Sequence, residues 1–384
     1  MARALYIHWP FCLSKCPYCD FNSHVRDGAN MDAWKAALLA DMQHEADEGA
    51  AGEALESIFF GGGTPSLMPP PLVAALIDRA ERLWGFSPEI EITLEANPSS
   101  VEASNFASLA AAGVNRVSLG VQSFDDAALQ FLGRLHGADE ARRAIATAQG
   151  NFGRVSFDLI YARPGQTADL WQEELEDALA IGTGHLSLYQ LTIEPSTRFA
   201  SDVRRGVFDP LADDPAADLF ALTREITAAN GLPAYEISNH ARPGEESRHN
   251  LAYWRYRDYY GIGPGAHGRR GGIATMRHRK PENYLAAVEA RSHGIVEARS
   301  LAREEQAAEV LLMGLRLAEG VAPDAIAHRF RLPSAALLDE GKVTLYRSLG
   351  LLTLQSGRLA VTDAGMPLLD AILSEIVAGE LVAS

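Results

Sequence analysis

The chain has 384 residues, of which 47% are apolar, and its 34 basic and 50 acidic side chains give a formal charge of −16. This composition excludes collagen-like, disordered and disulfide-stapled proteins, and the acidic balance argues against broad nucleic-acid binding, which needs clustered Lys and Arg. No apolar run approaches the roughly 20 residues that span a bilayer, and no signal peptide is recognisable, so we expect a cytoplasmic protein.

In chain order, short apolar segments alternate with longer amphipathic segments over the first two thirds of the sequence. The predicted strands are residues 4–9, 57–60, 89–95, 116–122, 154–161 and 185–193. The predicted helices are residues 31–45, 72–84, 101–112, 139–148, 170–180 and 216–229. Glycines suited to a left-handed helix end accompany several of them: Gly85, Gly113, Gly150, Gly182 and Gly231. Strand–helix units in this order predict a parallel sheet with helices outside, either open or curled into a full or partial barrel.

The alternation stops near residue 235, and residues 236–276 are rich in aromatic side chains, Arg, His and Gly. A helical pattern returns from residue 302, and residues 351–354 and 358–361 flank a turn-like segment, which predicts a hairpin. Helices followed by such a hairpin indicate a small winged-helix-like α+β domain for packing or partner docking. We therefore expect a barrel at residues 1–235, a connecting region at 236–300 and a C-terminal domain at 301–384.

Polar or glycine-rich residues follow successive predicted strands. The only three cysteines follow the first strand, the sequence GGGTP at residues 61–65 follows the second, and Glu95 and Asn97 close the third. Gln122 ends the fourth strand and Asp158 lies in the fifth. Because the carboxyl ends of parallel strands share one edge of a sheet or barrel, we expect these residues to meet at one mouth.

Cys12, Cys16 and Cys19 are too few and too close together to form a disulfide framework. Cys16 and Cys19 alone form a C-x-x-C redox motif, although the third thiol and the repeated strand–helix units do not suit a thioredoxin-like fold. With His8 or His24 the three thiols can complete a Cys₃His zinc site. Three thiolates can also hold a [4Fe–4S] cluster and leave one iron open, which is the interpretation that we favour.

The spacing C-x₃-C-x₂-C after a first strand, with GGGTP after the second, resembles the radical S-adenosylmethionine (SAM) superfamily. The resemblance implies a partial (β/α)6 barrel in which Cys12, Cys16 and Cys19 hold a [4Fe–4S] cluster. The open iron then binds the amino and carboxylate groups of SAM, and one electron splits the sulfonium bond to give a 5′-deoxyadenosyl radical. Gly62, Gly63 and Thr64 are implied beside the methionyl group, because glycine lets the backbone approach closely.

Further positions resemble the coproporphyrinogen-dehydrogenase branch of that superfamily. The SAM contacts that this resemblance implies are Tyr6, Tyr18, Glu95, Gln122, Arg134 and Asp158. Tyr18 is expected near the adenine, and Gln122 or Asp158 at the ribose hydroxyls. Phe21 stands where the porphyrinogen-oxidising enzymes carry a fourth cysteine, and the cluster motif begins at residue 12 without their N-terminal extension. Both departures put oxidative decarboxylation in doubt.

The sequence HNxxYW, formed by His249, Asn250, Tyr253 and Trp254, resembles the haem-binding signature of the HemW-type haem chaperones, and this resemblance covers nearly the whole chain. It implies that His249 is an axial ligand of haem iron and that Tyr253 and Trp254 stack on the macrocycle. The implied function is to deliver haem to acceptor proteins such as respiratory enzymes. Membrane association is not fixed at this stage, and peripheral docking on membrane proteins is one option.

Two questions stay open at this stage. No catalytic residue is assigned, and the alternative function is that of an oxygen-independent coproporphyrinogen III dehydrogenase or another radical enzyme acting on a tetrapyrrole. A zinc-binding scaffold is a third, weaker alternative.

Residues 261–267, with the sequence GIGPGAH, match a dinucleotide loop poorly and predict a tight loop near the barrel mouth. His267 and His278 are further candidate ligands that we expect to be structural.

Overall fold

The computed structural model describes residues 3–26, 28–49 and 54–377. Its central feature is a set of parallel strands that pair side by side in chain order. They are β1 (Ala4–Trp9), β4 (Leu55–Gly62), β5 (Phe86–Ala96), β6 (Arg116–Gln122), β7 (Arg154–Tyr161) and β8 (His185–Gln190). The expected α/β class and the parallel strands of a partial (β/α)6 barrel are thus confirmed.

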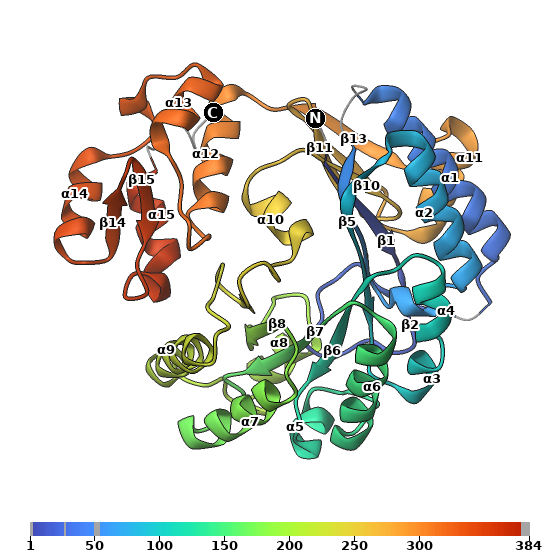
Figure 1. Cartoon of the computed structure of the whole chain (residues 1–384), viewed down its shortest axis with the longest axis horizontal. Coiled ribbons are helices and arrows are strands. Elements are labelled where there is room, and N and C mark those ends of the chain that lie inside the picture. The colour runs from blue at the N-terminus through green and yellow to red at the C-terminus, as the bar shows by residue number, and fades with distance from the viewer. Residues whose placement is uncertain (1–2, 27, 50–53, 378–384) are drawn as a thin grey trace.

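Helices follow these strands and form an arc around the outer side of the curved sheet (Figure 1). They are α1 (Met31–Glu48), α2 (Pro70–Trp84), α3 (Ser100–Ala103), α4 (Phe106–Ala111), α5 (Asp126–Phe131), α6 (Ala138–Asn151), α7 (Ala168–Ala180) and α9 (Asp213–Ala229). The short helix α8 (Arg198–Arg204) lies instead against the cysteine loop, where the Phe199 amide donates to the Pro17 carbonyl. Within the described ranges, no helix is both long and apolar enough to cross a membrane.

Two local predictions were wrong. The helix expected at residues 101–112 is divided into α3 and α4, and the Ser104 hydroxyl at the break donates to the Val101 carbonyl, which competes with continued helix. Gly150 does not end α6, which continues to Asn151. The chain there enters an extended conformation at buried Phe152, whose ring packs against Phe106, so no left-handed residue is needed.

Residues 236–300 do more than connect two domains, because they supply strands to both edges of the same sheet. These strands are β9 (Asn239–Ala241), β10 (Tyr259–Ile262), β11 (His267–Arg270), β12 (Ile273–Arg277) and β13 (Ile295–Ser300). β10 is parallel to β1, whereas β11 to β13 continue antiparallel and β9 pairs antiparallel with β8. Helix α11 (Pro281–Arg291) follows β12, and α10 (Arg248–Trp254) lies on the inner side of the sheet (Figure 1).

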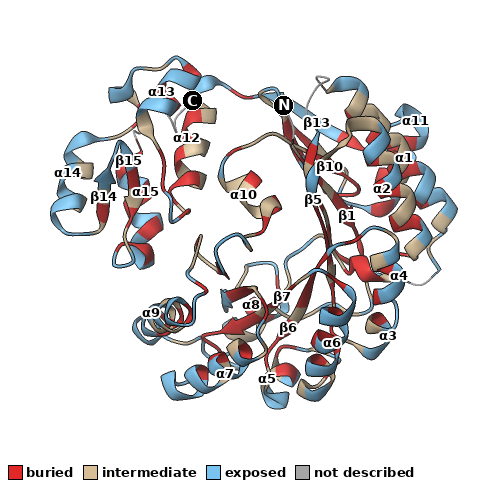
Figure 2. Cartoon of the chain, viewed as in Figure 1, coloured by how far each residue is buried: buried red, intermediate tan, exposed pale blue. Residues whose placement is uncertain are grey.

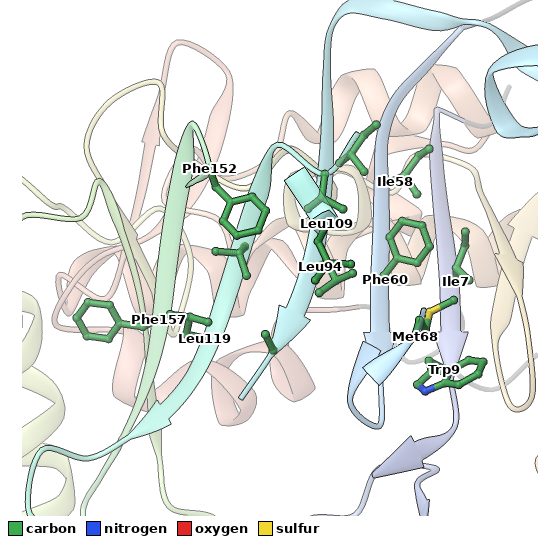
Figure 3. Close-up of a cluster of buried hydrophobic side chains, with 14 of the residues drawn as sticks. Ile7, Trp9, Ile58, Phe60, Met68, Leu94, Leu109, Leu119, Phe152 and Phe157 are labelled. Carbon is green, nitrogen blue, oxygen red and sulfur yellow. The ribbon is translucent and has the colours of Figure 1, made fainter. Parts of the chain in front are cut away.

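Side chains along the parallel strands alternate between an apolar outer face and a polar inner face, as strand geometry requires. Outward residues such as Ile7, Phe60, Leu94, Leu119 and Phe157 form the main core beneath the helices (Figure 3). Buried positions accordingly gather along the sheet and on the helix surfaces that face it (Figure 2). The residues between them in sequence point to the inner side, where they include Tyr6, Glu95, Ser118, Asp158 and Ser187.

The C-terminal part has a hydrophobic cluster of its own, which is centred on residues such as Leu311, Leu352, Leu359 and Ile372. Its elements are α12 (Arg303–Gly314), α13 (Pro323–Phe330), α14 (Glu340–Ser348), β14 (Leu352–Gln355), β15 (Arg358–Val361) and α15 (Leu369–Ile376). The predicted hairpin is present, and Ser356 and Gly357 both have positive φ, the turn type that suits a two-residue hairpin loop.

A buried ionic network joins α1 to β12. The Arg277 guanidinium is fully buried, and its Nε and Nη2 lie 2.7 Å from carboxylate oxygens of Asp41 and Glu45, respectively. The Tyr284 hydroxyl also donates to Asp41, over 2.9 Å. These bonds satisfy charges that would be costly to bury alone.

We expect Arg277→Ala to destabilise the protein by about 3–5 kcal/mol, because it leaves the Asp41 carboxylate buried without its cation and leaves Glu45 with Arg270 alone. Urea unfolding measures the change. Arg299→Ala is the matched control, since it removes a surface ion pair with Glu305 that solvent screens, and it should change stability little. Equal losses in both variants would contradict the importance of this network.

Candidate functional site

The carboxyl ends of the parallel strands open into one pocket, here called the cluster pocket. Its lining contains all three cysteines and most of the residues predicted to contact SAM, namely Tyr18, Gly62, Gly63, Thr64, Glu95, Gln122, Arg134 and Asp158. Tyr6 is the exception, because it lies deeper on the inner face of β1. The pocket also includes Asn97 and Ser118, which we did not single out as site residues.

The three thiols lie on a loop that leaves β1. Cys12 ends the short strand β2 (Phe11–Cys12), which pairs with β3 (His24–Val25), and the Cys19 amide donates to the Cys16 carbonyl. Thr64 Oγ1 donates to the Cys12 sulfur over 3.5 Å, and Arg134 Nη1 donates to the Cys16 sulfur over 3.3 Å. Donors placed at sulfur stabilise thiolates, the form that binds iron.

The arrangement of donors bears on the choice between zinc and a cluster. Among the described residues, no three His, Cys, Asp or Glu side chains converge on a point where a single metal ion fits. His8 has both ring nitrogens engaged, Nδ1 with the Tyr6 hydroxyl at 3.0 Å and Nε2 with the Asn22 carbonyl at 2.9 Å. Three thiols spaced around one pocket therefore suit a multi-iron cluster better than a Cys₃His zinc ion.

The glycines after β4 are required by close packing. Gly62 has φ +112°, and a Cβ there would lie 2.5 Å from the His8 ring, while a Cβ on Gly63 would lie 2.5 Å from the Phe11 carbonyl oxygen. The Gly62 amide donates to Glu95 Oε2 over 3.2 Å, and the Gly63 amide donates to the Trp9 carbonyl. Because the backbone amides of Gly62 and Gly63 already donate hydrogen bonds within the fold, they are not available to a ligand. A bound amine would instead donate to hydrogen-bond acceptors of this loop.

Two carboxyl groups that are partly shielded from solvent line the cluster pocket, Glu95 and Asp158. Burial raises the pKa of Glu95 to about 8, and the nearby Asp158 adds to that shift. Burial also raises the pKa of Asp158 to about 6, although Ser187 and Ser118 donate hydrogen bonds to it. Neither carboxyl forms an ion pair within the described residues. Such groups gain from a cationic ligand, and both the ammonium and the sulfonium of SAM meet that need.

Arg134, Asn97 and Gln122 complete the wall of the cluster pocket. Arg134 Nη2 donates to Asn97 Oδ1 over 2.6 Å and to the Gly120 carbonyl over 2.7 Å, and the Asn97 amide donates to Thr64 Oγ1. Gln122 has φ +73°, and its Oε1 is buried with no partner among the described residues. A strained residue that presents an unused acceptor suits a ligand hydroxyl. The sequence feature that could have identified Asn97 as a site residue is its position at the end of the third predicted strand.

Next to the cluster pocket, which has a volume of about 180 Å³, lies a second cavity of about 210 Å³, here called the inner cavity. It shares Glu95, Ser118 and Asp158 with the cluster pocket, so the two spaces are neighbours. Tyr6 lines the inner cavity together with Arg116, His185, His249, Asn250 and Tyr253. Tyr6 therefore faces the inner cavity and does not line the cluster pocket that contains the cysteines.

Helix α10 brings part of the HNxxYW motif to the inner cavity. The Glu91 carboxylate accepts from the amides of Arg248 and His249 at the start of the helix. Burial opposes ionisation of Glu91, yet Arg116 and Arg154 and these amides hold its pKa below the ordinary value. A carboxylate at a helix N-terminus is favourable, and this one fixes α10 to the sheet.

His249 is 1% exposed, and its Nδ1 lies 3.0 Å from Ser57 Oγ. Burial lowers its pKa to about 3, so the imidazole is neutral, and Nε2 has no partner among the described residues. Tyr253 follows one turn later on the same helix face and also lines the inner cavity. Trp254 lines neither the cluster pocket nor the inner cavity.

A third pocket, of about 360 Å³, lies beside the cluster pocket at the mouth and is here called the rim pocket. It shares Phe21, Gly62 and Glu95 with the cluster pocket, and Tyr6, Glu95 and Tyr253 with the inner cavity. Its remaining lining residues are His8, Asn22, Tyr259, Gly265, His267 and Arg279. The predicted tight loop after β10 forms part of this wall. His267, expected to be structural, is an exposed side chain of the rim pocket.

Comparison with known proteins agrees with this geometry. The family model of the Radical SAM superfamily matches residues 6–178, and that of the HemN C-terminal domain matches residues 301–368. The heme chaperone HemW of Escherichia coli is 43% identical over 303 residues, which cover 77% of this chain and 79% of that protein. The HemW of Haemophilus influenzae is 39% identical over 331 residues, or 83% of each chain.

A mitochondrial relative from Mus musculus, radical S-adenosyl methionine domain-containing protein 1, is 40% identical over 327 residues, which are 83% of this chain and 74% of that protein. Among solved structures, the coproporphyrinogen III oxidase HemN of Escherichia coli superposes with a TM-score of 0.81 at 22% identity. That match covers 97% of this chain and 89% of HemN, and it shows a shared fold.

The raised pKa of Glu95 predicts a specific pH dependence of stability. Folding raises this pKa from 4.5 to about 8, so the folded state binds the proton more tightly than the unfolded state. The resulting stabilisation is complete below the unfolded pKa and is lost as the pH rises through the folded pKa. In the cluster-free wild type, the free energy of unfolding should therefore decrease when the pH is raised from about 5 to about 8.5. The same rise in pH should cause a smaller decrease in Glu95→Gln.

Chemical denaturation at the two pH values tests this expectation. The exposed Glu81→Gln is the matched control and should follow the wild type. A Glu95→Gln variant with the same pH dependence as wild type would show that Glu95 ionises normally in the fold.

Proposed function

Because the chain belongs to the radical SAM superfamily and, within it, to the family of the HemW haem chaperones, we propose that it is a haem chaperone that also carries a [4Fe–4S] cluster and SAM. The observation that carries the proposal is the continuity of three spaces at one barrel mouth. Glu95 lines the cluster pocket, the inner cavity and the rim pocket alike. A tetrapyrrole and a cluster can therefore be neighbours here.

The residues of the cluster pocket suit the cofactors of the family. Cys12, Cys16 and Cys19 would hold the cluster, which supplies one-electron chemistry when bound. The Arg134 guanidinium donates a hydrogen bond to the Cys16 sulfur. Glu95 keeps a proton until a cationic ligand arrives, and Gln122 offers its unpaired oxygen to a hydroxyl. Tyr18, Gly62, Gly63, Thr64 and Asp158 form the rest of the proposed SAM site.

For haem, Tyr253 is the motif residue that reaches the mouth, since it lines both the inner cavity and the rim pocket. His249 and Asn250 line the inner cavity below it, and Trp254 lies outside the linings of the three spaces. We therefore propose that HNxxYW forms the wall behind the haem, with Tyr253 in contact with the macrocycle. Aromatic rings favour such flat, apolar ligands.

Delivery to haem-acceptor proteins such as respiratory enzymes completes the proposal. Exposed apolar side chains at the cluster pocket, Leu13, Phe21 and Leu135, offer a partner an apolar surface beside the cofactors. We place the protein in the cytoplasm, where cluster-binding thiols stay reduced. Association with membranes would occur through protein partners, because a charge of −16 opposes direct adhesion to anionic lipid.

A haem titration of the purified, cluster-loaded protein tests the function. We expect stoichiometric binding with a shift of the Soret band, and no anaerobic turnover of coproporphyrinogen III in the presence of SAM and a reductant. His249→Ala should weaken haem binding and leave the cluster in place, since it removes part of the wall behind Tyr253. The absence of any Soret shift would contradict the chaperone, and product formation would favour the dehydrogenase.

Cys16→Ala should abolish the cluster and leave the fold intact, because this thiol lies on a mouth loop and is only partly buried. Iron and sulfide analysis reports the cluster, and circular dichroism reports the fold. Ser14→Ala, on the same loop, is the control and should retain the cluster. A full cluster spectrum in Cys16→Ala would disprove the assignment of the cysteines.

A further inference from the structure

We propose that the iron of bound haem is ligated by His267 in the rim pocket, and that His249 of the HNxxYW motif is a positioning residue. This inference rests on the haem-binding function proposed above and assigns the ligand within it. It follows from the different accessibility of the two imidazoles, from the construction of the rim pocket, and from the chemistry of the side chains that line it.

His249 is enclosed by neighbours that leave no approach for a macrocycle. Its ring is stacked on Phe59 at 5.0 Å between centroids, and it meets the edge of Tyr253 at 4.7 Å. It lines the inner cavity, and its buried Nε2 has no hydrogen-bond partner within the described residues. Entry of haem would require displacement of α10, which Glu91 holds to the sheet through its N-terminal amides.

His267 has the opposite properties. It is the first residue of β11, its side chain is exposed, and within the described residues no hydrogen bond occupies either ring nitrogen. The rim pocket that it lines has a volume of about 360 Å³, which falls within the range of small-molecule sites. Haem could occupy this open pocket and still present an edge to an acceptor protein.

The wall that carries His267 is firmly built. Asn22 Nδ2 donates to the carbonyls of Pro264 and Arg279, at 2.9 Å each, and so ties the cluster loop to both sides of the β11–β12 hairpin. Gly265 has φ +78°, and a Cβ there would lie 2.5 Å from the Asn22 side chain. The loop before His267 is thus fixed by contacts that only glycine permits, which preorganises the imidazole.

The remaining side chains of the rim pocket match the other parts of haem. Phe21 is 61% exposed at the mouth, and together with Tyr253 and Tyr259 it offers aromatic surface to a flat ring. The exposed Arg279 guanidinium forms no ion pair within the described residues, so it is available for a propionate. An imidazole, aromatic faces and a cation therefore converge on one pocket, as a haem site requires.

This assignment gives the HNxxYW motif a different role from ligation. The His249 ring meets the Tyr253 ring at an interplanar angle of 84°, and Ser57 fixes the imidazole from the other side. His249 thereby sets the position of Tyr253 in the wall of the rim pocket. The haem would then lie directly beside the cluster pocket, across the shared residues Phe21, Gly62 and Glu95.

The experiment compares haem binding by the full chain with that of His267→Gly, His249→Ala and a matched control. The control is His278→Ala, because His278 lies near the same hairpin and lines none of the three spaces. Soret titration gives the affinity, and the iron–histidine band in the resonance Raman spectrum of the ferrous form reports the ligand. Thermal unfolding confirms that each variant folds.

We expect His267→Gly to lose the iron–histidine band and to bind haem about tenfold more weakly or worse, and added imidazole to restore the band. His249→Ala should bind more weakly and keep the band, and His278→Ala should resemble wild type. Phe21→Ala should weaken haem binding without loss of iron and sulfide from the cluster.

An unchanged band and affinity in His267→Gly would overturn the inference, and loss of the band in His249→Ala alone would assign the ligand to the motif instead. Wild-type protein that binds no haem at all would refute the proposed function, and the inference with it. The two failures are distinguishable, because the first leaves haem binding by wild type intact.

Discussion

The alternation of side chains along the parallel strands is the constraint on which the rest of the molecule depends. Each strand sends apolar residues such as Phe60 and Leu94 outward beneath the helices, and sends polar residues such as Glu95 inward. The outer contacts supply the core, so the inner face is free to hold carboxyl groups and hydroxyls. The cost of burying these groups is met by hydrogen bonds and, at the mouth, by the cationic ligands that they favour.

The inner face also explains how cluster and haem functions can coexist in one chain. Residues close in sequence serve adjoining spaces: Cys19 faces the cluster pocket, whereas Phe21 borders both that pocket and the rim pocket. Phe21, which by resemblance stands where the porphyrinogen-oxidising enzymes carry a fourth cysteine, is thus an exposed aromatic ring at the proposed haem site. We infer that Phe21 reflects a difference in function: the chain binds and carries a finished tetrapyrrole, whereas the porphyrinogen-oxidising enzymes convert one as a substrate.

Sequence reasoning recovered the parallel strands, the C-terminal hairpin and the residues of the cluster pocket, because short apolar strands and strand-end motifs are local signals. It missed β10 to β13, since segments such as β11, with sequence HGRR, gain their strand conformation from neighbours and not from apolar content. It placed Asn97 at the mouth but assigned it no role, because its hydrogen bonds are to Thr64 and Arg134, which are far away in sequence. As a candidate haem ligand, sequence reasoning ranked the buried His249 above the exposed His267. The burial of His249 depends on how α10 packs against the sheet, and a sequence motif carries no information about that packing.

The central claim is that haem and the cluster occupy adjoining pockets of one mouth. Zinc protoporphyrin, a fluorescent substitute for haem that accepts one axial histidine, tests it directly. Its excited-state lifetime in cluster-loaded wild type should be much shorter than in the cluster-free Cys16→Ala variant, because a cluster across Phe21 quenches it by electron transfer. Equal lifetimes in the two proteins, with the porphyrin bound in both, would show that the two cofactors lie apart and would contradict the account.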